Sequence, residues 1–227
     1  MKNLELIMQK IEQISSKNEL ENFFLEIEHL FNYSWAGLVI FEPYTSQRYK
    51  AVFIGDIPKK VCDFIEADEV IKQYCLTEGK PTNYQNILAA ANGFEKFEQK
   101  AIFPQEQHQL IVPIKGLASE LSCLVFSMPK ASVTHSLLEK LGWYWLLLSS
   151  FIYAKYKNLI TKNQSNITAR ELECIKWAAD GKTSWEISRI LSISQRTVDF
   201  HLANCISKTN SSNRQQAIVK YVLNGHL

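Results

Sequence analysis

TSWEISRILSISQRTVDFHLANCISK, residues 183–208, contains the clearest structural motif in this sequence. Its apolar residues predict a short helix over Thr183–Leu191 and a longer helix over Gln195–Lys208. Between them Ser192-Ile193-Ser194 predicts a tight turn, with the last serine placed to cap the second helix. Two helices joined in this way, the second longer and more polar, are typical of a helix-turn-helix.

The longer helix has an apolar face and an opposite face with polar groups and one aromatic ring. Val198, Leu202 and Cys205 fall on one stripe at about 100° per residue, so we expect them to pack inward. The opposite face would then point outward, toward the major groove of DNA. We predict base contacts by Arg196, Asp199, Phe200 and Ala203, and phosphate contacts by Lys182, Thr183, Gln195, Thr197, Asn204 and Lys208.

Two further helices are predicted around this pair. Thr168–Ala179 begins with Thr168 as N-cap and Glu171 at the capping-box position, and Gly181 follows its end. Asn213–Leu223 is the last predicted helix. The C-terminal part of the chain is therefore expected to be an all-α unit of four helices.

Charge is distributed unequally along the 227 residues, although the net charge is only +2. Residues 1–160 hold 16 Lys and Arg against 18 Asp and Glu, net −2, whereas residues 161–227 hold 9 against 5, net +4. The helical unit is thus the basic part, as phosphate binding requires. Because +4 is modest, we expect its DNA binding to depend on dimerisation and base contacts as well as on charge.

A polar segment separates the two parts. Residues 156–166, YKNLITKNQSN, show little apolar periodicity, which is typical of a linker. We predict a sensor and dimerisation domain over residues 1–157, a linker over residues 158–166 and a DNA-binding domain over residues 167–227.

The N-terminal part mixes helical and strand patterns, which predicts an α+β domain with a mostly antiparallel sheet packed by helices. The predicted strands are Trp35–Phe41, Tyr49–Ile54, Gln109–Ile114 and Leu121–Ser127. The predicted helices are Leu4–Ile14, Leu20–Phe31, Val61–Thr77 in one or two pieces, Phe94–Phe103 and Val133–Lys157.

Composition excludes several classes of protein. Hydrophobic residues make up 46% of the chain and charged residues 21%, which excludes intrinsic disorder. The five cysteines are odd in number and form no CxxC pair, so we expect free thiols in a reducing compartment rather than a zinc site or a disulfide framework. No nucleophile motif, phosphate loop or metal spacing is present, so we predict no enzyme, no metal and no cofactor.

Leu141–Ala154, LGWYWLLLSSFIYA, is the segment that could be taken for a membrane span. Its 14 residues would extend roughly 21 Å, short of the roughly 30 Å hydrocarbon core. We expect a soluble helix instead, with Trp143, Tyr144 and Trp145 in the domain core or at an interface. The N-terminus shows an amphipathic helix pattern rather than a signal peptide, so we predict a cytoplasmic protein with no membrane partner.

Residues 167–208, ITARELECIKWAADGKTSWEISRILSISQRTVDFHLANCISK, closely resemble the LuxR-type helix-turn-helix. The resemblance extends to Arg214 and Ala217 and covers about 60 residues. It implies a four-helix DNA-binding domain whose third helix enters the major groove and whose last helix often supports dimerisation. A homodimer would read two half-sites about one DNA turn apart, so a pseudo-palindromic operator in double-stranded DNA is expected.

The N-terminal part resembles the autoinducer-binding domain of the LuxR quorum-sensing regulators. LIVPIKGLASELSCLVFS, residues 110–127, is similar to the strand–loop–strand segment of that domain, and IPKKV, ADEVI and PTNY are similar to its ligand-pocket stretch. The resemblance and the aromatic residues nearby give a set of candidate ligand-binding residues: Trp35, Ile57, Val61, Ile65, Asp68, Tyr84 and Ser127.

Several of these positions depart from the family pattern for acyl-homoserine lactone. Ile57, Val61 and Ile65 stand where the family has Tyr, Trp and Tyr, and Tyr84 stands where it has Trp, so only Asp68 remains of the polar set. An alkyl side chain cannot donate a hydrogen bond to a lactone carbonyl. An acyl-homoserine lactone is therefore disfavoured, and three possibilities stay open: a non-lactone ligand that is apolar or aromatic, a lactone bound in an altered way, and no ligand at all.

We therefore predict an orphan, or solo, regulator of the LuxR type that binds DNA as a homodimer and senses a small, largely apolar, non-lactone molecule. The alternative is a ligand-independent dimeric regulator or protein-interaction module, whose pocket is filled by side chains.

Overall fold

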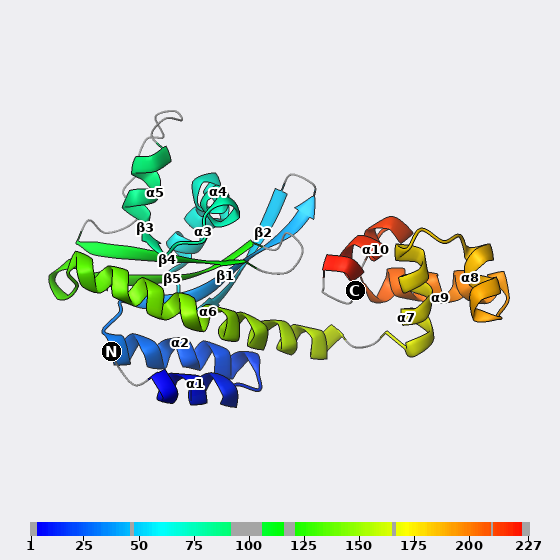
Figure 1. The fold of residues 1–227 in the computed structure, drawn as a ribbon, viewed down its shortest axis with the longest axis horizontal. Coiled ribbons are helices and arrows are strands. Elements are labelled where there is room, and N and C mark those ends of the chain that lie inside the picture. Colours follow the sequence, from blue (N-terminus) through cyan, green and yellow to red (C-terminus); the bar gives the residue numbers. More distant parts are fainter. Residues whose placement is uncertain are drawn as a thin grey trace. The chain divides into compact units, whose positions relative to one another are not determined.

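The computed structural model describes residues 4–45, 48–91, 106–115, 121–164, 167–209 and 211–223. The chain divides into two compact units, with a boundary in the sequence between Lys157 and Asn158 (Figure 1). The first unit is α+β and the second is all-α, which confirms the predicted fold class. In the described ranges no helix combines the length and the apolar character that crossing a membrane would need.

The first unit is built on a five-stranded antiparallel sheet with the strand order β2-β1-β5-β4-β3. The strands are β1 (Trp35–Thr45), β2 (Arg48–Gly55), β3 (Thr82–Asn83), β4 (Gln107–Lys115) and β5 (Leu121–Pro129). Neighbouring residues on one strand point to opposite faces. Trp35, Val39 and Phe41 thus share one face of β1, and Ala36 and Leu38 share the other.

Helices cover both faces of this sheet (Figure 1). One side carries α3 (Lys59–Ala67), α4 (Glu69–Thr77) and α5 (Tyr84–Ala91), and the other carries α2 (Lys17–Phe31) and α6 (His135–Gln164), with α1 (Leu4–Gln13) next to α2. A 3-10 turn, η1 (Lys130–Ser132), leads into α6. The face under α3, α4 and α5 holds the buried cluster that contains five of the seven candidate ligand-binding residues.

The structure decides one alternative, extends the final helix of the first unit and adds two short elements. The Val61–Thr77 pattern is two helices, because Asp68 ends α3 and caps α4. The predicted linker is helical up to Gln164, since residues 157–164 contain no Gly or Pro to stop the final helix. The short elements β3 and α5 were not predicted, and the predicted helix Phe94–Phe103 lies outside the described residues.

The second unit consists of α7 (Ala169–Ala179), α8 (Ser184–Leu191), α9 (Gln195–Lys208) and α10 (Arg214–Leu223) around one small core. Thr168 and Glu171 form the predicted capping box at α7, and Ser194 caps α9 by accepting from the Thr197 N–H at 3.1 Å. Thr183 caps α8 and forms a second capping box with Glu186, so it precedes the helix rather than starting it. These caps satisfy backbone donors that helix starts leave without partners.

Candidate nucleic-acid interface and ligand site

Helix α9 presents a polar and aromatic face to solvent. Arg196, Asp199, Phe200 and Ala203 are exposed, with Phe200 at 61%, whereas Val198, Leu202 and Cys205 are buried in the core of the unit. This confirms which side of the helix packs inward. A phenylalanine this exposed on a charged helix has its ring available to a partner.

The candidate phosphate-binding residues lie near the starts of two helices. Thr183 and Gln195 are exposed at the starts of α8 and α9, and Lys182 and Thr197 are half-buried beside them. Asn204 is also half-buried but lies further along α9. The Thr183 hydroxyl also donates to the Glu186 carboxylate at 2.8 Å, and the pKa of that carboxyl is lowered, chiefly by the backbone N–H of Thr183. Helix N-termini carry partial positive charge, so this edge favours an anion such as phosphate.

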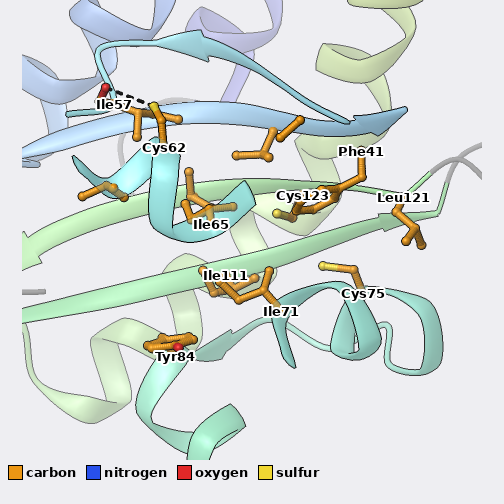
Figure 2. Packing of buried hydrophobic residues seen from close by; sticks show 14 of the residues in the cluster. Phe41, Ile57, Cys62, Ile65, Ile71, Cys75, Tyr84, Ile111, Leu121 and Cys123 are labelled. Atoms are coloured by element: carbon orange, nitrogen blue, oxygen red, sulfur yellow. Dashed lines mark hydrogen bonds between the residues drawn. The ribbon is translucent and has the colours of Figure 1, made fainter. Parts of the chain in front are cut away.

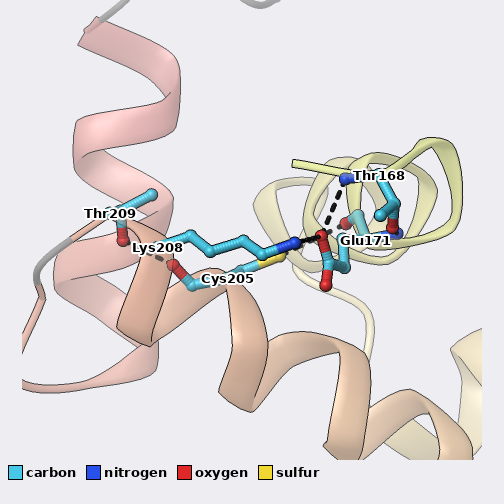
Figure 3. Close-up of polar contacts among 5 residues, drawn as sticks. All are labelled: Thr168, Glu171, Cys205, Lys208 and Thr209. Atoms are coloured by element: carbon cyan, nitrogen blue, oxygen red, sulfur yellow. Dashed lines mark hydrogen bonds and ion pairs between the residues drawn. The ribbon is translucent and has the colours of Figure 1, made fainter. Parts of the chain in front are cut away.

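Lys208 differs from the other predicted contacts because its ammonium is engaged within the protein (Figure 3). Its Nζ lies 2.7 Å from Oε2 of Glu171, a carboxylate that is 3% exposed and that also accepts the Thr168 N–H at 2.7 Å. Burial alone would raise the pKa of Glu171, but the hydrogen bonds from Lys208 and Thr168 outweigh it and lower the pKa. Lys208 therefore joins the end of α9 to the start of α7.

Arg214 fixes the approach to α8 from the start of α10. Its guanidinium donates to the Lys182 carbonyl at 2.7 Å and to the Ser184 hydroxyl at 3.2 Å. These two bonds hold the backbone on either side of Thr183, where a phosphate contact is predicted. The sequence motif included Arg214, but nothing in the sequence indicated these partners.

In the first unit, most of the candidate ligand-binding residues lie together. Trp35, Ile57, Val61, Ile65 and Tyr84 belong to one buried cluster between the sheet and α3, α4 and α5, and Figure 2 shows part of it. Cluster members that were not predicted include Phe41, Ile71, Cys75, Ile111 and Cys123. The strand residues among them, Phe41, Ile111 and Cys123, could have been identified from the sequence, because every second residue of β1, β4 and β5 faces this cluster.

Asp68 and Tyr84 meet at the edge of this cluster through a direct hydrogen bond. The Tyr84 hydroxyl donates to Oδ2 of Asp68 at 2.6 Å, while Oδ1 accepts the N–H groups of Val70 at 2.7 Å and Ile71 at 3.1 Å. Burial, followed by the bond to Asp68, raises the pKa of Tyr84 well above its usual value. The tyrosine is thus a persistent donor, and Asp68 uses both oxygens inside the protein.

Ser127 lies at one end of the same sheet face, in line with Trp35 on β1 and Gln109 on β4. Its side chain is fully buried and hydrogen-bonded to the Gln107 amide oxygen. Gln109, which was not predicted, is also buried, and its amide donates to the Gln107 carbonyl at 3.2 Å. The alternation of β4 places Gln109 on the face of Ile111, so strand periodicity could have identified it.

The cysteines and the buried lysine of the described residues offer no further reactive site. All five cysteines are free and buried, and burial raises the pKa of the Cys205 thiol to about 12. Within the described ranges, no three His, Cys, Asp or Glu side chains gather in a way that could hold a metal ion. The buried Lys72 pairs with Glu69 at 2.7 Å.

Comparison with known proteins gives matches to both units. The sequence model described as bacterial regulatory proteins, luxR family, matches residues 165–221. The chain is 30% identical to the transcriptional activator protein LuxR of Aliivibrio fischeri, over 97% of this chain and 93% of that protein. The crystal structure of Escherichia coli SdiA superposes with a TM-score of 0.68 at 22% identity, covering 98% of this chain and 96% of that one. SdiA in complex with octanoyl-rac-glycerol gives 0.62 at 19% identity, covering 97% and 93%.

Proposed function

The chain belongs to the LuxR family of bacterial transcriptional regulators, which are not enzymes, and from that premise we propose that it reads its operator through α9 as a homodimer. The outward face of α9 carries this proposal: Arg196, Asp199, Phe200 and Ala203 are exposed while the residues between them form the core. Such a face fits the major groove, where an arginine can pair with guanine and an aspartate can accept from cytosine.

The phosphate contacts we propose are a subset of those predicted from the sequence. Lys182, Thr183, Gln195, Thr197 and Asn204 lie at or beside the exposed starts of α8 and α9 or along α9. We leave out Lys208, because moving its ammonium to a phosphate would strip Glu171 of the partner that balances its buried charge.

The homodimer is proposed from an apolar stripe on α6 in the first unit. Trp143, Leu147 and Phe151 follow one another at four-residue spacing and are exposed at 54%, 58% and 46%. Tyr144 and Trp145 are instead buried in the unit's own core. Contiguous exposed apolar side chains mark interaction surfaces, and a second copy of α6 would match this one in character.

We propose that the first unit is a sensor for a small, largely apolar, non-lactone ligand, and that the chain is an orphan receptor. The cluster that would surround such a ligand is apolar, and Ile57, Val61 and Ile65 offer no side-chain hydrogen bond. The likeness to SdiA in complex with octanoyl-rac-glycerol supports the idea that this fold accepts an acyl chain without a lactone.

A second candidate is a dimeric regulator that takes no ligand. This candidate is supported by burial, since Trp35, Ile57, Val61, Ile65 and Tyr84 are each exposed by less than a tenth. Side chains alone can therefore cover these residues. Purified protein whose thermal midpoint does not respond to any acyl ligand would favour this candidate.

The test of DNA reading compares two arginine substitutions in the full-length protein. Arg196→Ala should cost about 1–3 kcal/mol on the selected operator and relax its sequence preference. Arg170→Ala removes the same charge from α7, where the arginine pairs with Glu173 at 2.8 Å, and it should leave the sequence preference unchanged. Equal losses for Arg196→Ala on operator and random DNA would count against base reading by α9.

A further inference from the structure

We propose that the hydrogen bond between His108 and Asn83 is a pH-sensitive latch, which holds β3 and α5 on the sheet of the first unit and opens when acid protonates His108. The segment that it holds is residues 82–91, in which the two residues of β3 lead directly into α5 (Figure 1). This segment contributes Tyr84 and Ile87 to the buried cluster, so the latch controls how firmly α5 covers that cluster. The inference goes beyond the proposed function, because it requires neither a ligand nor DNA.

Backbone pairing attaches this segment to the sheet over a short distance. β3 is the outermost strand beside β4, and its two residues, Thr82 and Asn83, stand opposite Ile111 and Leu110. A strand of two residues is short even for a sheet edge, so it forms few ladder hydrogen bonds. The side-chain bond from Asn83 to His108 of β4, at 2.9 Å, is therefore a substantial part of what joins the segment to the sheet.

A second contact of Asn83 fixes which group donates in this bond. The Oδ1 atom of Asn83 accepts the Gln85 N–H at 3.3 Å at the start of α5, so the NH2 group is the one that faces His108. An NH2 group can only donate, so Nδ1 of His108 accepts and the imidazole is neutral, with its proton on Nε2. Asn83 is 7% exposed, so water gives its NH2 group little replacement for this acceptor.

Protonation of His108 removes the acceptor. Nδ1 has one lone pair, and an imidazolium carries a proton on each nitrogen, so the Nδ1–H would meet the Asn83 NH2 donor to donor. If Asn83 turned its amide round to offer Oδ1, the NH2 group would face the Gln85 N–H, and the start of α5 would lose its acceptor. In either case acid removes one hydrogen bond from the segment formed by β3 and α5.

The charged groups around His108 oppose its protonation. Burial is the larger cause that lowers the pKa of this half-buried histidine below its usual 6.5, followed by the positive charges of Lys130 in η1 and His135 at the start of α6. β3 and α5 contribute no charged side chain, Met128 stands opposite on β5, and the acidic Glu106 before β4 is exposed. The latch is thus closed above about pH 6.5 and opens as pH falls from 6.5 through the lowered pKa.

Hydrogen exchange followed by mass spectrometry tests the latch in the full-length protein. Protection factors, which are corrected for the intrinsic effect of pH on exchange, are compared at about pH 7.5 and about pH 5.5. We expect the protection of peptides from residues 82–91 to fall about three- to tenfold in acid, as the loss of one hydrogen bond allows. Peptides from α2, on the other face of the sheet, should keep their protection within about twofold.

Two substitutions assign the effect to this pair. His108→Asn keeps a side-chain acceptor near the place of Nδ1 but does not titrate, so the protection of residues 82–91 should no longer fall in acid. Asn83→Asp places a carboxylate beside the ring and keeps an acceptor for the start of α5, so protonated His108 should form an ion pair and acid should preserve or raise the protection. His29→Asn is the matched control, because it removes an exposed histidine of α2 and should leave the native fall unchanged.

Three results would overturn the proposal. The first is equal protection of residues 82–91 at both pH values in the native protein, and the second is a native-sized fall in His108→Asn or in Asn83→Asp. The third is an equal fall in the α2 peptides, which would mark a general loss of stability in acid rather than the opening of β3 and α5. The two substitutions change opposite partners of the same bond, so either one decides the matter should the other fail to fold.

Discussion

Replacing Lys208 by Met tests whether the ion pair with Glu171 holds the end of α9 in place. The substitution keeps the length of the side chain but removes the ammonium 2.7 Å from a carboxylate that is 3% exposed. Removing one partner of a buried pair costs about 3–5 kcal/mol. Because the Lys208 side chain is itself 31% exposed and the Thr168 N–H remains on Glu171, we expect a smaller loss of about 2 kcal/mol.

The loss should depend on pH with a defined sign. The folded-state pKa of Glu171 lies below its usual 4.5, so the pair stabilises the fold above that value and its contribution fades as pH falls through the folded pKa. Without Lys208, burial dominates and the pKa of Glu171 should rise. The difference in stability between native and Lys208→Met should therefore be full near pH 7 and shrink as pH falls from the raised pKa of Glu171 in the variant through its lowered pKa in the native protein.

Hydrogen exchange followed by mass spectrometry measures the loss of stability in the full chain, because peptides from α7 and α9 report on the second unit alone. A loss of about 2 kcal/mol corresponds to about 30-fold faster exchange through opening of these helices. Lys176→Met, an exposed lysine of α7, is the control and should change exchange little. A Lys208→Met protein with native exchange at pH 7, or with the same loss at pH 7 and pH 4, would refute this account of the pair.

Three further predictions address the caps, the sheet and the dimer. Thr183→Ala should destabilise α8 by about 1 kcal/mol, because it removes the hydroxyl that accepts the Glu186 N–H. Faster hydrogen exchange of α8 peptides would show this loss, and unchanged exchange would contradict the capping role. Gly37→Ala should lower the stability of the first unit by about 1–3 kcal/mol, since the new Cβ would lie 2.5 Å from Cδ1 of Ile57 and 2.6 Å from the Ile54 carbonyl oxygen. A variant with the native thermal midpoint would show that these neighbours move aside without cost. Leu147→Glu should shift the protein toward monomer in analytical ultracentrifugation, because it places a charge on the proposed dimer face of α6. Leu25→Glu, which changes an exposed leucine of α2, should leave the dimer intact, and equal effects of the two substitutions would argue against α6 as the dimer face.

The helices of the DNA-binding unit could be predicted because their start signals are local. Thr168 and Glu171 are three residues apart, as are Ser194 and Thr197, so a reader of the sequence sees both partners at once. The inward stripe of α9 likewise follows from helical spacing alone. Lys208 and Glu171 are instead 37 residues apart, and only the packing of α9 on α7 brings them together. The phosphate role predicted for Lys208 did not take this partner into account.

The first unit was less predictable because its polar contacts and short elements depend on tertiary structure. Tyr84 and Asp68 are 16 residues apart, and Trp145 donates to the Tyr33 hydroxyl across 112 residues. Helix α5, YQNILAAA, has only eight residues and β3 has only two, so neither gives a strong sequence signal. The long strands β1, β4 and β5 were found because their apolar runs are bounded and β-branched.

The two units use their polar groups in opposite ways, and this bears on how a ligand could control DNA binding. In the part of the chain that the structure describes, neither Arg196 nor Asp199 takes part in an ion pair, so α9 can meet DNA without first breaking one. Asp68, by contrast, accepts three hydrogen bonds within the first unit, and a ligand that replaces one of them must supply the free energy to do so. A ligand shifts a conformational equilibrium only by its difference in affinity for the two states. The apolar ligand proposed above would act through the buried cluster, so control of the proposed dimer should depend on how acyl-chain length changes the packing between the sheet and α3, α4 and α5.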